Sequence, residues 1–197
     1  MAAVDSKKKE EDQVREAPFT YEMYAEMPDD GQRYEIIDGN LELMSPGASF
    51  SHQAVGGELE YLLKQSCKSE YIILDAPLDV ILSPTNVLQP DLLMVRRSRM
   101  HIVTNRGIEG PPDLVAEVLS PSTRKRDKIK KAAAYARFGV EEYWIVDGDS
   151  RTLEQYRLDG DGKYELHNLF EGDDLVSSDK LPCVSFRVSD LFVDVID

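Results

Sequence analysis

The sequence predicts a mixed α/β fold whose core runs in the order helix, strand, strand, strand, helix, strand. Apolar residues recur at helical spacing from Ser51 to about Lys68. Strand-like apolar runs follow within residues 71–82, 91–95 and 114–119. A second helical pattern, Ser122–Phe138, then precedes the apolar run Tyr143–Val146. Elements in this order predict a sheet that is covered by helices.

The N-terminal part predicts a tail, a short helix and a hairpin. Residues 1–17 are charged and lack a hydrophobic period, which predicts a disordered tail ahead of a single domain at 18–197. Thr20 can cap a helix at Tyr21–Met27. An N-terminal hairpin is predicted over 34–44, because Gly39 can supply the positive φ that a tight turn needs.

The remaining boundaries follow from caps and turns. Ser122 or Thr123 can cap the second helix, and Gly139 fits its C-terminal left-handed position. After Asp147 the pattern predicts a C-terminal β-meander, with strands at 152–158, 164–170 and 184–188.

Composition and charge restrict the function classes. The net charge of −14 counts against a protein that coats nucleic acid nonspecifically, although a local basic patch can still engage a few phosphates. No apolar run is long enough to span a membrane, so we expect no membrane partner. Cys67 and Cys183 are predicted to be reduced thiols in a cytoplasmic protein. A phosphate-cradling Gly-rich loop is missing, and we expect no small-molecule cofactor.

Acidic side chains beside apolar strands are the first candidates for chemistry. Asp91 and Glu117 each adjoin a strand-like run, where a carboxylate is costly to desolvate without a positive partner. If the strands are neighbours, both could hold Mg²⁺ or Mn²⁺, with the carbonyl of Val118 as a third ligand. Glu35, in the hairpin, could add a carboxylate to a second metal or to the attacking water. Exposed edge carboxylates or simple ion pairs explain the same spacing, and spacing alone slightly favours them.

A basic helix follows the second acidic strand. Its cations are Arg124, Lys125, Arg126, Lys128, Lys130 and Lys131. Asp127, Lys131 and Tyr135 are spaced by four and share one face. The helix is either a solvated surface, or a phosphate guide with Lys131 as a catalytic cation. His52, at a helix start, either caps that helix or bonds a phosphate or the catalytic water.

Three segments carry a resemblance to a known family. They are RYEIIDGNLELMSPGASFSH, LQPDLLMV and GPPDLVAEVLSPSTRKRDKIKKAAAYARFGVEEYWIVD. In order and spacing they resemble the Uma-two family of restriction endonucleases, within the PD-(D/E)XK nuclease superfamily. The resemblance covers roughly Phe19 to Leu158 and implies a restriction-endonuclease-like core.

The resemblance also implies roles for particular residues. Glu35, Asp91 and Glu117 match the acidic positions, and His52 matches a histidine often seen in the family. The usual lysine two residues after the glutamate is missing, because Leu119 stands there. Lys131 of the following helix matches the lysine that replaces it. The implied mechanism is phosphodiester hydrolysis, with metal held by Asp91, Glu117 and the Val118 carbonyl.

Three hypotheses follow. The first is a homodimeric, Mg²⁺- or Mn²⁺-dependent endonuclease that hydrolyses DNA. The second is a catalytically weak or inactive nuclease-fold module that binds nucleic acid or regulates; the acidic charge and Leu119 favour it. The third is a structural protein that interacts through an edge strand, and only the C-terminal meander supports it.

Overall fold

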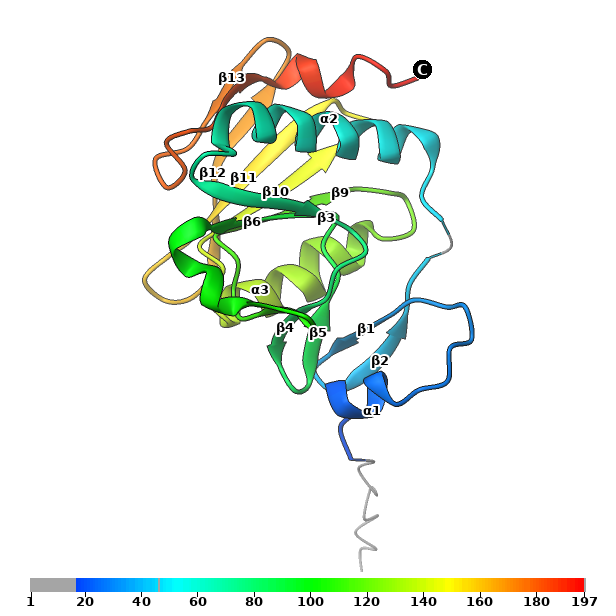
Figure 1. Cartoon of the computed structure of the whole chain (residues 1–197). Helices are drawn as coiled ribbons and strands as arrows, with labels where there is room; N and C mark the ends of the chain where they lie inside the picture. Colours follow the sequence, from blue (N-terminus) through cyan, green and yellow to red (C-terminus); the bar gives the residue numbers. More distant parts are fainter. Residues whose placement is uncertain (1–16, 46, 197) are drawn as a thin grey trace, which may run out of the picture.

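The computed structural model describes residues 17–45 and 47–196 (Figure 1). All but the last residue of the predicted tail at 1–17 lies outside this range. The single domain at 18–197 stays a prediction.

The main sheet has six strands in the order β12-β11-β10-β9-β6-β3. Their bounds are β3 Tyr71–Asp75, β6 Leu92–Arg96, β9 Leu114–Val118, β10 Glu142–Asp147, β11 Thr152–Leu158 and β12 Tyr164–Glu171. All neighbours are antiparallel except β9 and β10, which are parallel and joined through a helix. With the helix before β3, this is the predicted helix-strand-strand-strand-helix-strand core.

Helices cover both faces of this sheet (Figure 1). Helix α2 (Phe50–Cys67) begins at Ser49, whose side chain accepts a hydrogen bond from the His52 amide. Its apolar stripe packs on one face together with the C-terminal segment. Helix α3 (Ala132–Arg137) packs on the other face, against strands of a second sheet. Alternate residues of β6 and β9 therefore pack into two separate hydrophobic cores, one on each face of the sheet.

The second sheet has the order β2-β1-β5-β4-β8-β7. Its strands are β1 Tyr34–Ile37, β2 Asn40–Leu43, β4 Val80–Ser83, β5 Asn86–Leu88, β7 Val103–Thr104 and β8 Gly107–Glu109. The N-terminal hairpin is confirmed, with positive φ at Asp38 and Gly39. Helix α1 (Tyr21–Ala25) precedes it and is capped by Thr20, as predicted.

One predicted strand was wrong. The run at 71–82 is two strands in different sheets, since β3 pairs with β6 while β4 pairs with β5 and β8. Pro77 lies between them and has no N–H to continue a ladder.

The second helix is less regular than predicted. A π-helical turn, η2 (Arg126–Lys131), precedes α3, and the amide of Ala132 bonds the Asp127 carbonyl across five residues. The turn buries Asp127 and Lys131 together. Gly139 ends the helix with a φ of 82°, as its position predicts.

The C-terminal meander is confirmed in part. Strands β11 and β12 extend the main sheet, while β13 (Leu175–Ser177) and β14 (Ser185–Arg187) form a separate pair. A 3₁₀ helix, η3 (Val188–Phe192), follows and packs near α2. None of the helices among the described residues is both long and apolar enough to cross a membrane.

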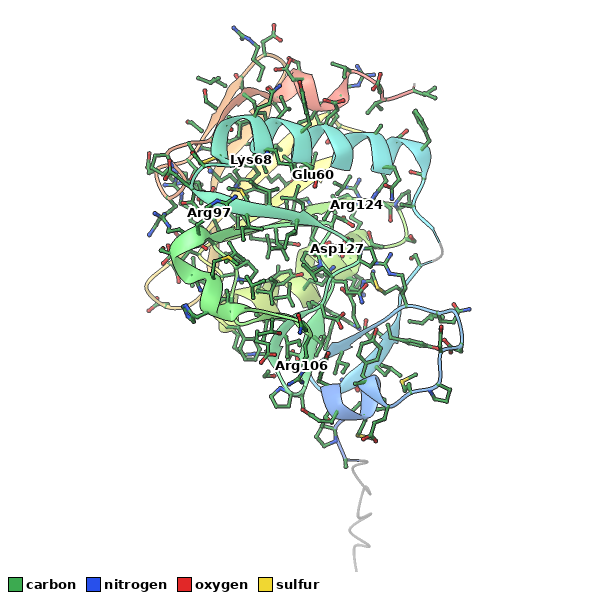
Figure 2. All side chains as sticks on the ribbon, viewed as in Figure 1. Glu60, Lys68, Arg97, Arg106, Arg124 and Asp127 are labelled. Atoms are coloured by element: carbon green, nitrogen blue, oxygen red, sulfur yellow. A yellow bond between two sulfur atoms is a disulfide. The ribbon has the colours of Figure 1, made fainter. Side chains whose placement is uncertain are left out.

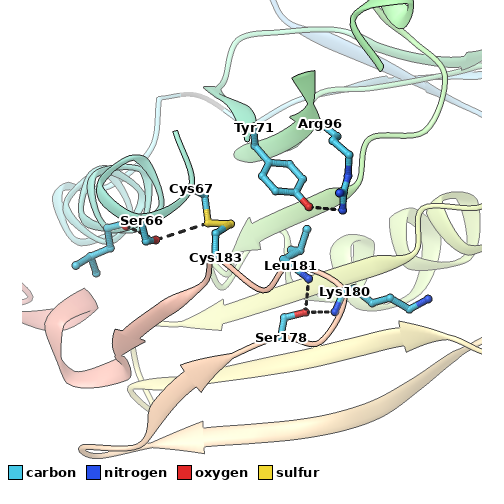
Figure 3. Close-up of a disulfide and its surroundings, with 9 residues drawn as sticks. Ser66, Cys67, Tyr71, Arg96, Ser178, Lys180, Leu181 and Cys183 are labelled. Carbon is cyan, nitrogen blue, oxygen red and sulfur yellow. Dashed lines mark hydrogen bonds between the residues drawn. A yellow bond between two sulfur atoms is a disulfide. The ribbon is translucent and has the colours of Figure 1, made fainter. Parts of the chain in front are cut away.

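The prediction of two reduced thiols was wrong. Cys67, at the end of α2, is disulfide-bonded to Cys183, in the loop before β14 (Figure 3). The packing of the C-terminal segment on α2 brings the two Cα atoms to 5.1 Å across 116 residues of chain, within bridging range. The cytoplasmic location stays a prediction.

The disulfide gives a first testable expectation. Replacing Cys183 with serine should lower the free energy of unfolding by about 2–5 kcal/mol, because the unfolded chain regains the freedom of a long closed loop. Urea denaturation measures the change. Dithiothreitol should lower the wild-type midpoint and leave that of Cys183→Ser unaltered; a wild-type midpoint that ignores the reductant would contradict the bond.

Candidate active site

Asp91 and Glu117 lie on the same face of the main sheet. In the β6–β9 ladder Leu92 pairs with Ala116, so one further step of that register sets Asp91 opposite Glu117. Asp91 is two residues from Leu93, and Glu117 is two residues from Val115, so each shares a face with its neighbour. Leu93 and Val115 belong to the core that packs against α3, the α3-side core. Directly opposite side chains on one face lie about 5 Å apart at Cβ. The two carboxylates therefore line one cavity, as the sequence suggested.

The backbone of Val118 completes this donor set. Its amide donates to Asp91 Oδ2 at 2.8 Å, while the next amide, of Leu119, donates to the Val146 carbonyl on β10. The N–H and C=O of one strand residue point to the same side. The carbonyl of Val118 is therefore on the side of Asp91.

Lys131 occupies the centre of the acidic cluster. Its ammonium lies 2.6 Å from Glu117 Oε1 and 3.0 Å from Glu35 Oε1, and all three side chains are almost fully buried. Asp127 Oδ1 lies 4.0 Å from the same nitrogen. The structure thus places Lys131 beside Glu117, where the family resemblance expected the displaced lysine.

Neighbouring groups hold the cluster. The backbone N–H of Gln89 donates to Glu35 Oε1 at 2.9 Å, and the backbone carbonyl of Gln89 accepts from Lys131 at 3.3 Å. The Tyr135 hydroxyl donates to Glu117 Oε1 at 3.0 Å. Glu117 Oε1 therefore has two donors, while no described residue bonds its other oxygen, Oε2.

His52 reaches the same cavity from the start of α2. Its Nε2 lies 3.2 Å from Asp91 Oδ2. The hydrogen bond to Asp91 raises the pKa of His52 against the opposing effect of burial. Burial raises the pKa of Asp91, but the hydrogen bond and charge of His52, with Lys131, bring that pKa below its usual value. His52 thus helps to keep Asp91 ionised.

Burial and the neighbouring charges together set the pKa values of Glu117 and Lys131. Desolvation, reinforced by nearby carboxylates, raises the pKa of Glu117 well above its usual value, and Lys131 offsets only part of this. Desolvation lowers the pKa of Lys131, but Glu117 and Glu35 outweigh it and raise the net value. Lys131 is therefore a fixed cation, too tightly held as ammonium to act as a base.

The cavity has a volume of about 400 Å³. Three buried polar atoms near it lack a hydrogen-bond partner: Glu35 Oε2, Arg126 Nε and Asp127 Oδ1. Arg126 Nη1 lies 3.6 Å from Glu35 Oε2 and its Nε 3.9 Å from Asp127 Oδ1. Figure 2 labels Asp127 near the middle of the view, between α2 and the β1–β2 hairpin. Such atoms indicate room for water or a ligand group.

The basic helix is largely neutralised by acids. Within ion-pair distance lie Asp147 for Arg124, Glu35 for Arg126, Glu154 for Lys128 and Glu42 for Lys130. Lys128 and Lys130 have side chains 31% and 56% exposed, whereas Lys131 is 2% exposed. The helix therefore supplies Lys131 and the partly buried Arg126 to the cluster, and its interpretation as an open phosphate guide finds little support.

Sequence reasoning missed Gln89 and Arg126. Gln89 acts on the cluster through its peptide group, which no residue pattern reveals. Its position directly before Pro90-Asp91 was the available signal. Arg126 was counted as a surface cation, yet its side chain is only 16% exposed beside Glu35.

The donor set fits a divalent cation. The carboxylates are Glu35, Asp91, Glu117 and Asp127, and the permanent cations are Arg126 and Lys131. The formal charges of these four carboxylates and two cations sum to −2, before any charge on His52 is counted. Among the described residues, no group of three or more His, Cys, Asp or Glu side chains is arranged so that it could hold a metal ion by itself. Mg²⁺ needs only one or two carboxylates besides water and substrate phosphate, which Asp91 and Glu117 could provide.

Comparisons with known proteins agree with the resemblance. The model of the Uma-two family, described as "Uma2: Putative restriction endonuclease", matches residues 21–189. A crystal structure of "a putative nuclease belonging to DUF820" from Anabaena variabilis is 21% identical, with a TM-score of 0.71; the alignment covers 89% of this chain and 98% of that one. This likeness confirms the restriction-endonuclease-like fold.

Two further comparisons add little. The type IIG restriction endonuclease BpuSI aligns at 15% identity over 75% of this chain and 16% of its own, with a TM-score of 0.39, from which we draw nothing. No curated protein matches the chain.

The buried cluster gives a second expectation. Lys131→Met should destabilise the fold by about 3–5 kcal/mol, because it leaves Glu35 and Glu117 buried without their cation. The neighbouring Lys130→Met, which breaks a solvent-exposed pair with Glu42, should cost about 0–1 kcal/mol. Urea denaturation of both variants measures the difference.

The pH dependence of this loss has a definite sign. Glu117 has a raised pKa, so its burial disfavours the fold above its unfolded pKa and the penalty fades as pH falls and it takes up a proton. The deficit of Lys131→Met should therefore shrink between neutral and acidic pH. A deficit that grows on acidification would contradict the proposed cause.

Proposed function

Because this chain belongs to the Uma2 family, we propose that it is a divalent-metal-dependent endonuclease that hydrolyses DNA phosphodiester bonds. One observation carries the proposal: Asp91 and Glu117 line one cavity together with Lys131, and the Val118 backbone is bonded to Asp91. Paired oxygen donors next to a fixed cation suit a phosphate with a developing negative charge.

Each residue has a role in this proposal. Asp91, Glu117 and the Val118 carbonyl would hold Mg²⁺ or Mn²⁺, which when bound activates water and neutralises phosphate charge. Glu117 Oε2 is the oxygen left for this purpose, since Oε1 accepts from Lys131 and Tyr135. Lys131 stabilises the charge that develops on the phosphate. His52 holds Asp91 ionised, and Glu35 fixes Lys131 and orients water.

A homodimer is part of the proposal, since a duplex has two strands to cut. Two copies related by a two-fold axis would present two sites to opposite strands. Light scattering at working concentration tests this, and a monomer there would remove the dimer from the proposal.

A nucleic-acid-binding module without turnover is the second candidate. The observation in its favour is that Lys131 already pairs with both Glu35 and Glu117, so the cluster contains a cation without metal or substrate. The two candidates differ in metal use. Turnover requires a cation at Asp91 and Glu117, while mere binding does not.

Metal binding provides a third expectation. Isothermal calorimetry should detect a Mn²⁺ site that Glu117→Gln weakens by at least tenfold, because the substitution removes an anionic ligand. Glu109→Gln, an exposed glutamate on β8 of the second sheet, is the matched control and should bind as wild type does. Equal affinity in all three proteins would rule out Glu117 as a ligand.

Cleavage provides a fourth expectation. Plasmid and single-stranded DNA incubated with Mg²⁺ or Mn²⁺ should be cut by wild type, and the rate should fall at least a hundredfold in Asp91→Ala, as when a main electrostatic contribution is lost. Wild-type protein that binds Mn²⁺ and DNA without cutting either substrate would instead favour the binding module.

A further inference from the structure

Arg33 lies at the cavity wall just before β1, and it is exposed. Its Nε and Nη2 both donate to Gln89 Oε1, at 3.1 and 2.7 Å. A neutral amide oxygen thus occupies one edge of the guanidinium. Among the described residues Nη1 has no hydrogen-bond partner, so this end of the side chain is available to a ligand.

No carboxylate of the described residues contacts Arg33 directly, although burial raises the pKa of Asp79, on the far side of Gln89, and the charge of Arg33 partly offsets that effect. Arg124, Arg126, Lys128 and Lys130, on the helix beside the same cavity, each lie within ion-pair distance of a carboxylate. Arg33 forms no ion pair with any residue that the structure describes. In a chain of net charge −14, an arginine whose direct partner is a neutral amide keeps a positive charge at the cavity.

The position of Arg33 is fixed by a relay. The Gln89 Nε2 group donates to Asp79 Oδ1 at 2.8 Å, which turns the amide so that its oxygen meets Arg33. The peptide of the same Gln89 bonds Glu35 and Lys131. One residue therefore sets the distance between the Arg33 guanidinium and the acidic cluster, and a side chain held in place loses less freedom on binding.

We propose that Arg33 binds a backbone phosphate of the nucleic acid that flanks the scissile phosphate. This inference rests on the proposed function and adds a substrate contact to it. The planar guanidinium can give parallel N–H bonds to two phosphate oxygens. Gln89 and Asp79 are positioning residues: Gln89 contacts the guanidinium directly, and Asp79 orients Gln89 without itself contacting Arg33.

The matched pair of variants is Arg33→Gln and Arg97→Gln. Arg97 is also exposed and bonds a backbone carbonyl, of Lys68. It follows the far end of β6 from Asp91, and Figure 2 places it at the left of the view, away from Asp127. Both changes remove one positive charge, so only position distinguishes them.

Binding is measured by fluorescence anisotropy of a labelled oligonucleotide, single- or double-stranded, in EDTA at several salt concentrations. Arg33→Gln should weaken affinity about tenfold, as when one charged hydrogen-bonded contact is lost. The slope of log affinity against log salt should decrease by about 0.7–0.9, the value of one phosphate contact. Arg97→Gln should keep the wild-type slope.

Kinetics and metal affinity separate this inference from the proposed function. Arg33→Gln should raise KM with little change in kcat and retain wild-type Mn²⁺ affinity, because the flanking phosphate does not react. Variants that bind alike while wild type cuts DNA would overturn the Arg33 contact alone. Wild type that neither binds nor cuts nucleic acid would overturn the proposed function and this inference together.

Discussion

The ammonium of Lys131 joins the two sheets of this fold. It pairs with Glu35 on β1 of the second sheet and with Glu117 on β9 of the main sheet. The chain crosses between these sheets at 89–91, and the Gln89 carbonyl accepts from the same ammonium. Each charged group is buried and would destabilise the fold if it lost its partner. Loss of one group would therefore disrupt both the site and the contact between the sheets.

This arrangement explains how a migrated lysine can serve the same site. The position two residues after Glu117 is Leu119, which packs in the α3-side core, so a lysine there would not lie beside Glu117 without disturbing that core. The π turn before α3 instead brings Lys131 from the next element to Glu117. Extra helical turns of this kind often occur at functional sites. The cation has the same neighbour although its origin in the chain differs.

The sequence predicted the parts of the site that depend on local patterns. The sequence proposed Asp91 and Glu117 as a pair only if their strands were neighbours, and the β6–β9 register supplies that condition. Helical spacing together with the family resemblance singled out Lys131. The sequence did not predict β5 and β7, because strands of three and two residues are too short to show a period. Pairings across long separations were also beyond local patterns: Cys67 with Cys183 is one, and Lys130 with Glu42 is another.

The net charge of −14 becomes understandable once the pairs are known. Acids pair with Arg124, Lys128 and Lys130 of the helix beside the cavity, so the formal charge of that helix overstates the attraction that a polyanion would feel there. Long-range attraction would then contribute little to binding, and short-range contacts inside the cavity would have to supply most of it. A protein built in this way would discriminate between nucleic acids by the shape and phosphate positions that its cavity accepts. General affinity for polyanions would play a minor part.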